Sequence, residues 1–124
     1  MLYNKCVLFR FDPASDAPLF EQLAASVRTD AAAGRLQPGD RLPSAREVAA
    51  SLGVNLHTVL HAYQDLRDEG LVDMRRGRGA VVTDAAEPLA SLHSEILALA
   101  RSARGLGLSP DAIASLVKEA AREQ

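Results

Sequence analysis

Hydrophobic residues recur at helical spacing in several separate stretches of the chain. The first stretch predicts an amphipathic helix that ends near Gly34. Its inward face is formed by Leu19, Phe20, Leu23, Val27 and Ala31. Asp16 offers an N-cap for this helix. Before it, the alternation of residues from Val7 to Phe11 has a period of two and predicts a short strand that ends at Asp12.

Two helices separated by only three residues are predicted in the middle of the chain. Ser44 is followed three residues later by Glu47, the capping-box pattern, so a short helix begins there and ends at Gly53. Asn55 can cap the next helix, which runs to about Glu69. Its inward face is formed by Val59, Ala62, Tyr63 and Leu66. Two helices joined by so tight a turn cross steeply, which is the helix-turn-helix arrangement.

A β-hairpin is predicted directly after these helices. Residues 71–74 and 80–83 have the composition of strands, and the turn between them is rich in arginine and glycine. The turn consists of Arg75, Arg76, Gly77, Arg78 and Gly79. A hairpin in this place is the wing of a winged helix-turn-helix domain.

The pattern becomes helical again near residue 85. The first of two helices carries an apolar stripe of Leu89, Leu92, Ile96 and Leu99 and is interrupted at residues 105–107. The last helix is capped by Ser109, and its inward residues include Ile113, Leu116 and Val117. The fold class is therefore mainly α with a small β hairpin. We expect a winged helix-turn-helix domain over residues 1–84 and two C-terminal helices over residues 85–124.

Composition narrows the class of protein. The 124 residues are 48% hydrophobic, which suits a compact domain with an appendage. Cys6 is the only cysteine, so an intrachain disulfide is excluded, and a reducing cytoplasm fits best. The sequence contains no apolar run of signal-peptide or membrane-spanning length. The net charge of −2 is low for a protein that binds duplex DNA, but residues 35–83 contain seven arginines against six acidic residues.

From Pro18 to Val82 the sequence resembles the DNA-binding domain of the GntR family of bacterial regulators. The matching segments are Pro18-Leu19-Phe20-Glu21-Gln22-Leu23, Gly34-Arg35-Leu36, Pro38-Gly39-Asp40-Arg41-Leu42-Pro43-Ser44-Ala45-Arg46-Glu47, Gly53-Val54, Thr58-Val59, Ala62-Tyr63, Leu66, Glu69-Gly70-Leu71-Val72 and Arg76-Gly77-Arg78-Gly79. About forty residues follow, enough for two helices, which is similar to the YtrA-type subfamily. The larger subfamilies carry an effector or aminotransferase-like domain, for which this chain has no room.

The resemblance implies that duplex DNA is the partner and that Arg46, the start of the third helix and the wing turn contact it. On the third helix the candidates are Asn55, Leu56, His57, Thr58, Leu60, His61 and Gln64. Some relatives have arginines where this chain has Leu56 and Leu60, so those base contacts cannot be transferred. Asn and Gln can pair with adenine, and an apolar side chain can touch a thymine methyl group. The plainer alternative is a solvated helix face.

Several of these residues also have a second interpretation. His57 and His61 are four residues apart and could share a metal with Cys6 or His93, but imidazoles also hydrogen-bond to bases and phosphates, so we expect no metal and no cofactor. Arg46 lies in the first turn of a helix, where the helix dipole disfavours a cation and a phosphate would offset that cost. A salt bridge from Arg46 to Asp40 or Glu47 is the alternative. The wing arginines could be ordinary surface charges of a hairpin.

The two C-terminal helices are too short to form a domain alone. Their stripes, formed by Leu89, Leu92, Ile96, Leu99, Ile113, Leu116 and Val117, could cap the core of the DNA-binding domain. Pairing with a second copy would bury both of them, and it suits a symmetric DNA site. We therefore expect a homodimeric repressor that binds a palindromic operator. An effector, if there is one, is expected to be a small apolar or flat cationic molecule, because this segment offers few polar anchors.

Two other classes of function compete with this expectation. An enzyme is disfavoured because no nucleophile–base pair, paired carboxylates or phosphate-binding glycine loop is found in the sequence. A winged helix that binds only other proteins is the stronger alternative, and the net negative charge supports it. Binding to duplex DNA that weakens steeply with salt would separate the two.

Overall fold

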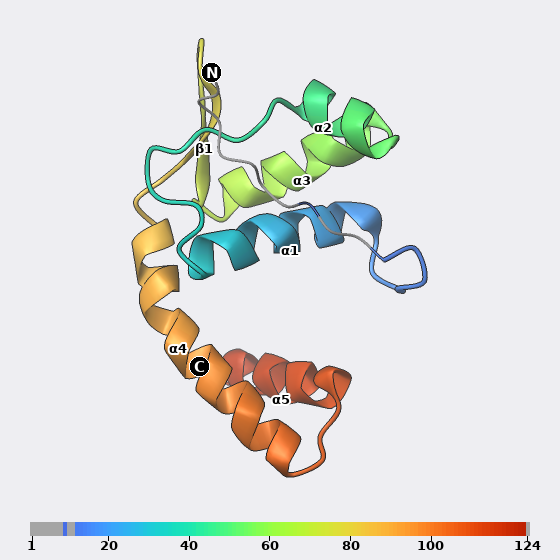
Figure 1. Ribbon diagram of the computed structural model, residues 1–124, viewed down its shortest axis with the longest axis vertical. Helices are drawn as coiled ribbons and strands as arrows, with labels where there is room; N and C mark the ends of the chain where they lie inside the picture. Colours follow the sequence, from blue (N-terminus) through green and yellow to red (C-terminus); the bar gives the residue numbers. More distant parts are fainter. Residues whose placement is uncertain (1–8, 10–11, 124) are drawn as a thin grey trace. The chain divides into compact units, whose positions relative to one another are not determined.

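The computed structural model describes residue 9 and residues 12–123 (Figure 1). These residues form mainly helices with one small β hairpin, as the sequence predicts. The chain divides into two compact units, Met1–Ser91 and Leu92–Gln124, which we call the head and the tail. The strand predicted over residues 7–11 lies outside the described residues except for Phe9, which is partly buried against the core of the head. The division at Ser91 lies within a helix, and the boundary expected at residue 84 stays a prediction.

Helix α1 spans Leu19–Ala32, and Gly34 follows it with a φ of 84°, as expected for the residue that ends a helix. The prediction of its N-cap was wrong. Pro18 occupies that position without a side-chain hydrogen bond, and Asp16 lies two residues further upstream. Gln22 organises the start instead, because its side-chain Nε2 donates to the carbonyl oxygen of Ala17 over 2.9 Å.

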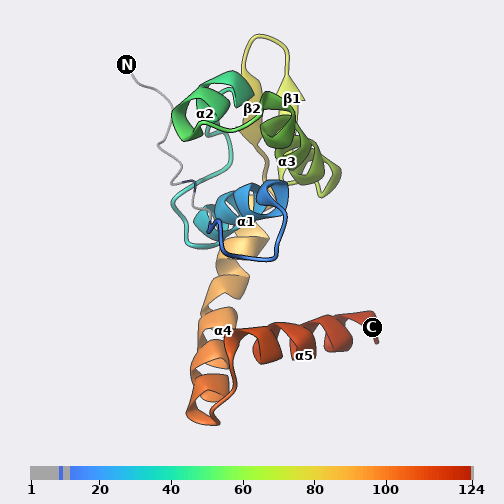
Figure 2. The ribbon, with the colours of Figure 1, turned by 90° about the vertical axis from the view of Figure 1, so that its right-hand side faces the viewer.

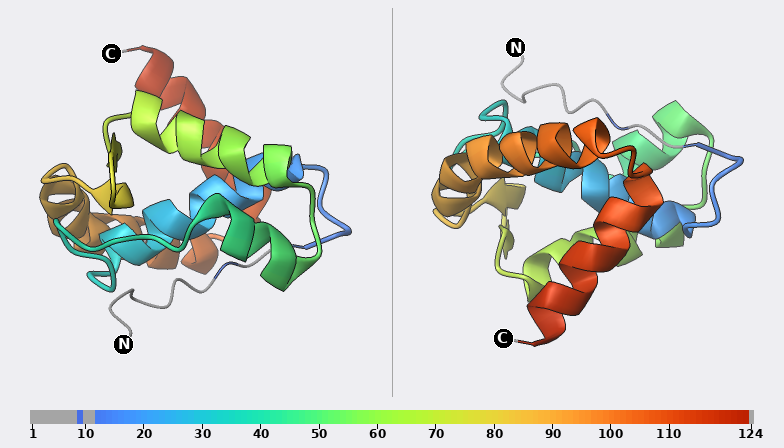
Figure 3. Two further views of the ribbon diagram at one scale, coloured as in Figure 1. Left: turned by 90° about the horizontal axis from the view of Figure 1, so that it is seen from above. Right: turned by 90° about the horizontal axis from the view of Figure 1, so that it is seen from below.

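Helices α2 (Ala45–Leu52) and α3 (Leu56–Asp68) begin as the sequence predicts. The backbone N–H of Glu47 donates to Oγ of Ser44, and the backbone N–H of Ser44 donates to the Glu47 carboxylate, both over 3.1 Å. Gly53 follows α2 in the left-handed conformation with a φ of 69°, which glycine adopts without the steric cost of a Cβ atom. The short connection to α3 is visible in the left-hand view of Figure 3.

Strands β1 (Val72–Arg75) and β2 (Gly79–Val82) form the antiparallel wing, with Val72 opposite Val82 and Arg75 opposite Gly79. The other edge of β2 pairs with residues 39–42, which the sequence pattern did not predict. Gly39 donates to the carbonyl oxygen of Val82 over 2.8 Å, and Leu42 donates to that of Ala80 over 2.9 Å. The segment that leads into α2 is therefore hydrogen-bonded to the wing.

The core of the head lies between α1, α2, α3 and the wing. The inward faces predicted for α1 and α3 supply much of it, and helix α4 (Ala86–Gly105) adds Ala86. Its largest fully buried apolar side chains include Leu23, Val27, Leu36, Val59, Leu66, Val72 and Val82. Burial of this kind stabilises a fold by about 25 cal/mol for each Å² of apolar surface removed from water. The core thereby fixes α3 and the wing on one rigid body.

The tail contains the C-terminal part of α4 (Ala86–Gly105) and all of α5 (Pro110–Arg122). Ser109 caps α5, since its Oγ accepts a hydrogen bond of 3.1 Å from the backbone of Ala112. Within the tail, α5 crosses α4 at a steep angle (Figures 1 and 2), and no described residue of α5 is buried. Among the described residues, no helix combines the length and apolar character needed to cross a membrane.

Candidate nucleic-acid interface

Arg46 lies at the second position of α2 and is exposed. The salt bridge considered for it is not formed with Asp40 or with Glu47, whose carboxylate accepts from the backbone of Ser44. Within the described part of the chain, the Arg46 guanidinium has no hydrogen-bond or ion-pair partner. A cation in the first turn of a helix is opposed by the helix dipole, and an external anion beside Arg46 would offset that cost.

Tyr63 fixes the start of α2 relative to α3. Its phenol donates a hydrogen bond of 2.6 Å to the carbonyl oxygen of Pro43, the residue before the N-cap Ser44. The side chain is buried, and burial raises the pKa of Tyr63 above its ordinary value, with the nearby Glu47 carboxylate adding to the rise. The phenol therefore stays protonated and remains a donor at physiological pH.

The first turns of α3 present a polar surface with one apolar side chain in it. His57 and Gln64 are exposed, and Leu60 between them is partly exposed. Asn55 is exposed but partly occupied, because its Oδ1 accepts a 2.7 Å hydrogen bond from the backbone N–H of His57. The remaining candidates are less available. Thr58 is only partly exposed, and Leu56 packs against the core of the head.

His61 is engaged with the head's own residues. Its imidazole stacks on the ring of Phe20 in α1, with ring centroids 3.7 Å apart and planes inclined by 13°. Its Nε2 also lies 3.6 Å from the carboxylate of Asp65, one turn further along α3. Of the two histidines proposed to face DNA, His57 is therefore the one without a side-chain partner among the described residues. Within those residues no cluster of three metal-binding side chains is found.

The wing turn is exposed from Arg75 to Gly79. Gly77 and Gly79 have φ values of 81° and 73°, a left-handed conformation that favours glycine and makes the tight turn. Arg75 lies 3.3 Å from the carboxylate of Asp73, whereas the guanidinium groups of Arg76 and Arg78 have no partner within the described residues. The tip of the wing therefore carries two uncompensated positive charges.

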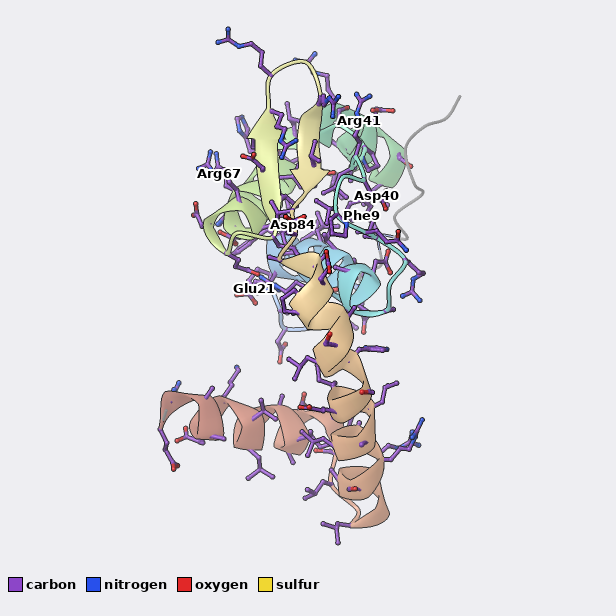
Figure 4. The ribbon with its side chains drawn as sticks, turned by 90° about the vertical axis from the view of Figure 1, so that its left-hand side faces the viewer. Phe9, Glu21, Asp40, Arg41, Arg67 and Asp84 are labelled. Carbon is purple, nitrogen blue, oxygen red and sulfur yellow. The ribbon has the colours of Figure 1, made fainter. Side chains whose placement is uncertain are left out.

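Arg41 belongs to this surface, although sequence reasoning did not select it. It forms a β-bridge with Val81, and its Nε donates a 3.2 Å hydrogen bond to the carbonyl oxygen of Arg78 at the wing turn. Figure 4, in which Arg41 is labelled, shows the residue beside the hairpin. In the sequence, the position of Arg41 between the Pro38-Gly39 turn and Arg46 was the feature that could have identified it. The pairing of residues 39–42 with β2, which brings Arg41 next to the wing, cannot be read from the sequence.

A different face of the head, formed by α1 and α3, is acidic. Glu21, Asp65, Asp68 and Glu69 line a shallow groove there together with Arg28. Arg28 and Glu69 form an ion pair, in which Nε of Arg28 lies 2.8 Å from Oε1 of Glu69. The hydrogen bond from Arg28 lowers the pKa of Glu69, and the same bond raises the pKa of Arg28. The groove therefore gathers four carboxylates of the head and only one arginine.

The apolar residues expected to form a dimer interface fall into two groups. Leu89 belongs to the head and packs against its core. The others belong to the tail, where Ile113 is partly exposed and the remaining five are exposed. These five are Leu92 at 43%, Ile96 at 46%, Leu99 at 48%, Leu116 at 59% and Val117 at 47%. Large exposed apolar side chains are therefore frequent in this short segment.

Comparison with known proteins places this arrangement in a family. Residues 19–82 match the family described as "Bacterial regulatory proteins, gntR family". The repressor YtrA of Bacillus subtilis is 36% identical over 64% of this chain and 62% of its own length. The transcriptional regulator Rv1152 of Mycobacterium tuberculosis is 38% identical over 81% of this chain and 83% of its own.

Solved structures agree with the sequence relatives. YtrA from Sulfolobus acidocaldarius, a GntR-family transcription factor, superposes with a TM-score of 0.59 at 38% identity, over 73% of this chain and 98% of that one. AraR(DBD), solved in complex with operator ORE1, has a TM-score of 0.52 at 27% identity, over 61% of this chain and 95% of that one. The family match and the winged helix-turn-helix geometry agree on the family of this chain. The chain belongs to the gntR family of bacterial regulatory proteins, resembles its YtrA type, and is a transcription regulator, not an enzyme.

Proposed function

We propose that the chain is a homodimeric repressor that binds a palindromic operator in the bacterial cytoplasm. The first turns of α3 enter the major groove, and His57, Leu60 and Gln64 contact base edges there. Arg46 and the wing arginines bind the flanking sugar-phosphate backbone or the adjacent minor groove. Each protomer then reads one half-site.

The observation that carries this proposal is the presence of unpaired cations on α2 and on the wing, the elements that precede and follow α3 in the head. Arg46 at the start of α2 and Arg76 and Arg78 on the wing have no partner within the described residues, and all three are exposed. The hydrogen bond from Tyr63 to Pro43 and the pairing of residues 39–42 with β2 hold their backbones to the same core as α3. A polar helix face together with cations on the neighbouring elements suits DNA, where phosphates lie on both sides of each groove. AraR(DBD) was solved with an operator, which supports the same reading of this head.

The competing function is a winged helix that binds only proteins, and salt separates the two. Neutralising phosphates releases counterions, so the logarithm of the affinity should fall linearly with that of the salt concentration, by about 0.9 for each phosphate contact. Titration of the full chain with a duplex selected from a random pool would measure this slope. A slope close to zero, or no selected duplex, would support the protein-binding alternative.

The exposed apolar side chains of the tail support the proposal of a homodimer. Leu92, Ile96 and Leu99 of α4 and Leu116 and Val117 of α5 are each more than 40% exposed within one chain. A twofold contact would cover these side chains with their own counterparts and would join two heads in one molecule. Linked heads gain affinity for two half-sites through effective concentration. Sedimentation of the full chain tests this directly, and a monomer at micromolar concentration would contradict it.

An effector, if the repressor has one, would suit a cleft of about 340 Å³ in the head. Apolar residues line most of it, among them Leu36, Pro38, Ala86 and Ala90, and Glu87 supplies a negative charge. We propose that a small apolar or flat cationic molecule binds there. Calorimetry against a panel of small molecules tests the proposal, with Glu87→Gln expected to weaken a cation and not a neutral compound. Tight binding of a sugar phosphate would contradict it.

A further inference from the structure

The start of α3 lacks the residues that usually read guanine. No lysine or arginine occurs from Asn55 to Leu66, and the first cation of the helix is Arg67, which lies 3.7 Å from the carboxylate of Asp68. Guanine is most often recognised by a bidentate arginine or lysine on its O6 and N7 atoms. The face of α3 that holds His57 and Gln64 must therefore obtain its base preference from other contacts.

Leu60 is the apolar group on that face. It follows His57 by three residues and precedes Gln64 by four, so the three side chains are neighbours on the helix surface. His57 and Gln64 are exposed, and Leu60 is partly exposed. Leu56, one turn earlier, packs against the core of the head, whereas Leu60 is not among the described side chains that do so. Leu60 is thus a partly exposed apolar side chain between two exposed polar neighbours.

We propose that Leu60 is a specificity-determining residue that reads the C5 methyl group of a thymine in each operator half-site. The inference rests on the proposed function, because it requires the start of α3 to lie in the major groove. Thymine is the base that presents a methyl group there, and an aliphatic side chain is the natural partner for it. The contact gives an A·T pair at this position an advantage that does not depend on any charge.

Replacement of thymine by deoxyuridine tests the contact, since it removes the methyl group and leaves the base-pairing edge unchanged. The probe is the full chain with a duplex selected from a random pool, in which each thymine is replaced in turn. We expect the wild-type chain to lose affinity about fourfold for each half-site at one position, which is the effect of one methyl-sized apolar contact. Leu60→Ala should bind the thymine and deoxyuridine duplexes equally. Gln64→Ala, the matched control on the same face, should keep the wild-type ratio.

A second variant gives the opposite readout. Leu60→Arg introduces a bidentate donor, so selection from the random pool should enrich guanine at the position that wild type reads as thymine. Loss of the thymine preference in Leu60→Ala together with gain of guanine in Leu60→Arg supports the proposal. A wild-type chain that binds deoxyuridine as tightly as thymine at every position overturns it while leaving DNA binding intact. A chain that selects no duplex at all overturns the proposed function and this inference together.

Discussion

Tyr63 of α3 is hydrogen-bonded through its phenol to the carbonyl oxygen of Pro43, and this contact joins α3 to the residue before the α2 cap. Arg46 stands three residues beyond Pro43. The position of an exposed phosphate-binding candidate is thus set by a buried side chain of the neighbouring helix. A substitution in the core can therefore change DNA binding without touching a residue on the surface.

Tyr63→Phe removes this hydrogen bond and leaves the ring in place. The variant should unfold with a free energy lower by about 1 kcal/mol, the usual contribution of a buried hydrogen bond. Because the start of α2 is then less restrained, operator affinity should fall as well. Urea denaturation gives the first quantity and titration of the selected duplex gives the second. Unchanged stability would show that the bond to Pro43 contributes nothing.

The raised pKa of Tyr63 predicts how stability depends on pH. Burial favours the neutral phenol, so the folded-state pKa lies above the unfolded value of about 10. The corresponding stability is complete below pH 10 and is lost as the pH rises from there through the folded-state pKa. The free energy of unfolding should decline more steeply in wild type than in Tyr63→Phe over this alkaline range. Denaturation curves for both chains at a series of pH values measure the difference, and parallel declines would contradict it.

Arg41 should act by holding the wing as well as through its charge. Arg41→Ala removes the donor to the Arg78 carbonyl and should weaken operator binding by about tenfold, which corresponds to 1.4 kcal/mol. Arg41→Lys keeps the charge and lacks the planar Nε donor, so it should restore only part of the affinity. Hydrogen exchange at residues 76–79 should be faster in both variants. Full recovery of affinity in the lysine variant would mean that charge alone matters.

Arg78→Ala should change the salt dependence of binding. If Arg78 binds a phosphate, its loss should lower the slope of log affinity against log salt by about 0.9 for each head bound. The loss of affinity should be similar for all duplex sequences, because phosphate contacts carry no base information. Arg101→Ala, which removes an exposed arginine of the tail, is the control and should leave the slope unchanged. Equal slopes for wild type and Arg78→Ala would contradict the prediction.

Charges placed on the exposed stripes of the tail should separate the two copies. Leu99→Glu combined with Leu116→Glu changes side chains that are 48% and 59% exposed, so the single chain should still fold. The variant should sediment as a monomer and bind a palindromic operator about a hundredfold more weakly, while its affinity for a single half-site is retained. Ser102→Glu adds a charge at an exposed polar position and should remain dimeric. A dimeric double variant would place the interface elsewhere.

The sequence predicts best those features that are local. Ser44, Asn55 and Ser109 were identified as caps because a cap is specified by residues two or three positions apart, and all three are caps in the structure. The wing hairpin was found for the same reason. The prediction of Asp16 as the N-cap of α1 was wrong because several residues in that loop could cap a helix. Pro18 occupies the N-cap position in the structure, where the Gln22 side chain bonds to the loop.

Contacts between segments that are distant in the sequence could not be predicted from local patterns. The pairing of residues 39–42 with β2 joins positions about forty residues apart. Residues 39–42 have no alternation of apolar and polar residues that would predict a strand. His61 has the helical spacing of a DNA-facing residue, but its stacking on Phe20 depends on how α1 packs against α3. Leu89 fits the stripe of the tail in sequence and packs against the head instead, because α4 begins within the head.

The first turns of α3 contain buried positions and surface positions. Val59, Ala62 and Tyr63 are buried, whereas His57, Leu60 and Gln64 make no side-chain hydrogen bond or ion pair within the described residues. Mutations at the second set should therefore be nearly neutral for folding, and mutations at the first set should not. With these three residues contacting base edges as proposed, operator preference could drift during evolution, one base pair at a time, without passing through unfolded intermediates. A duplicated copy of such a gene could acquire a new target while keeping the same scaffold.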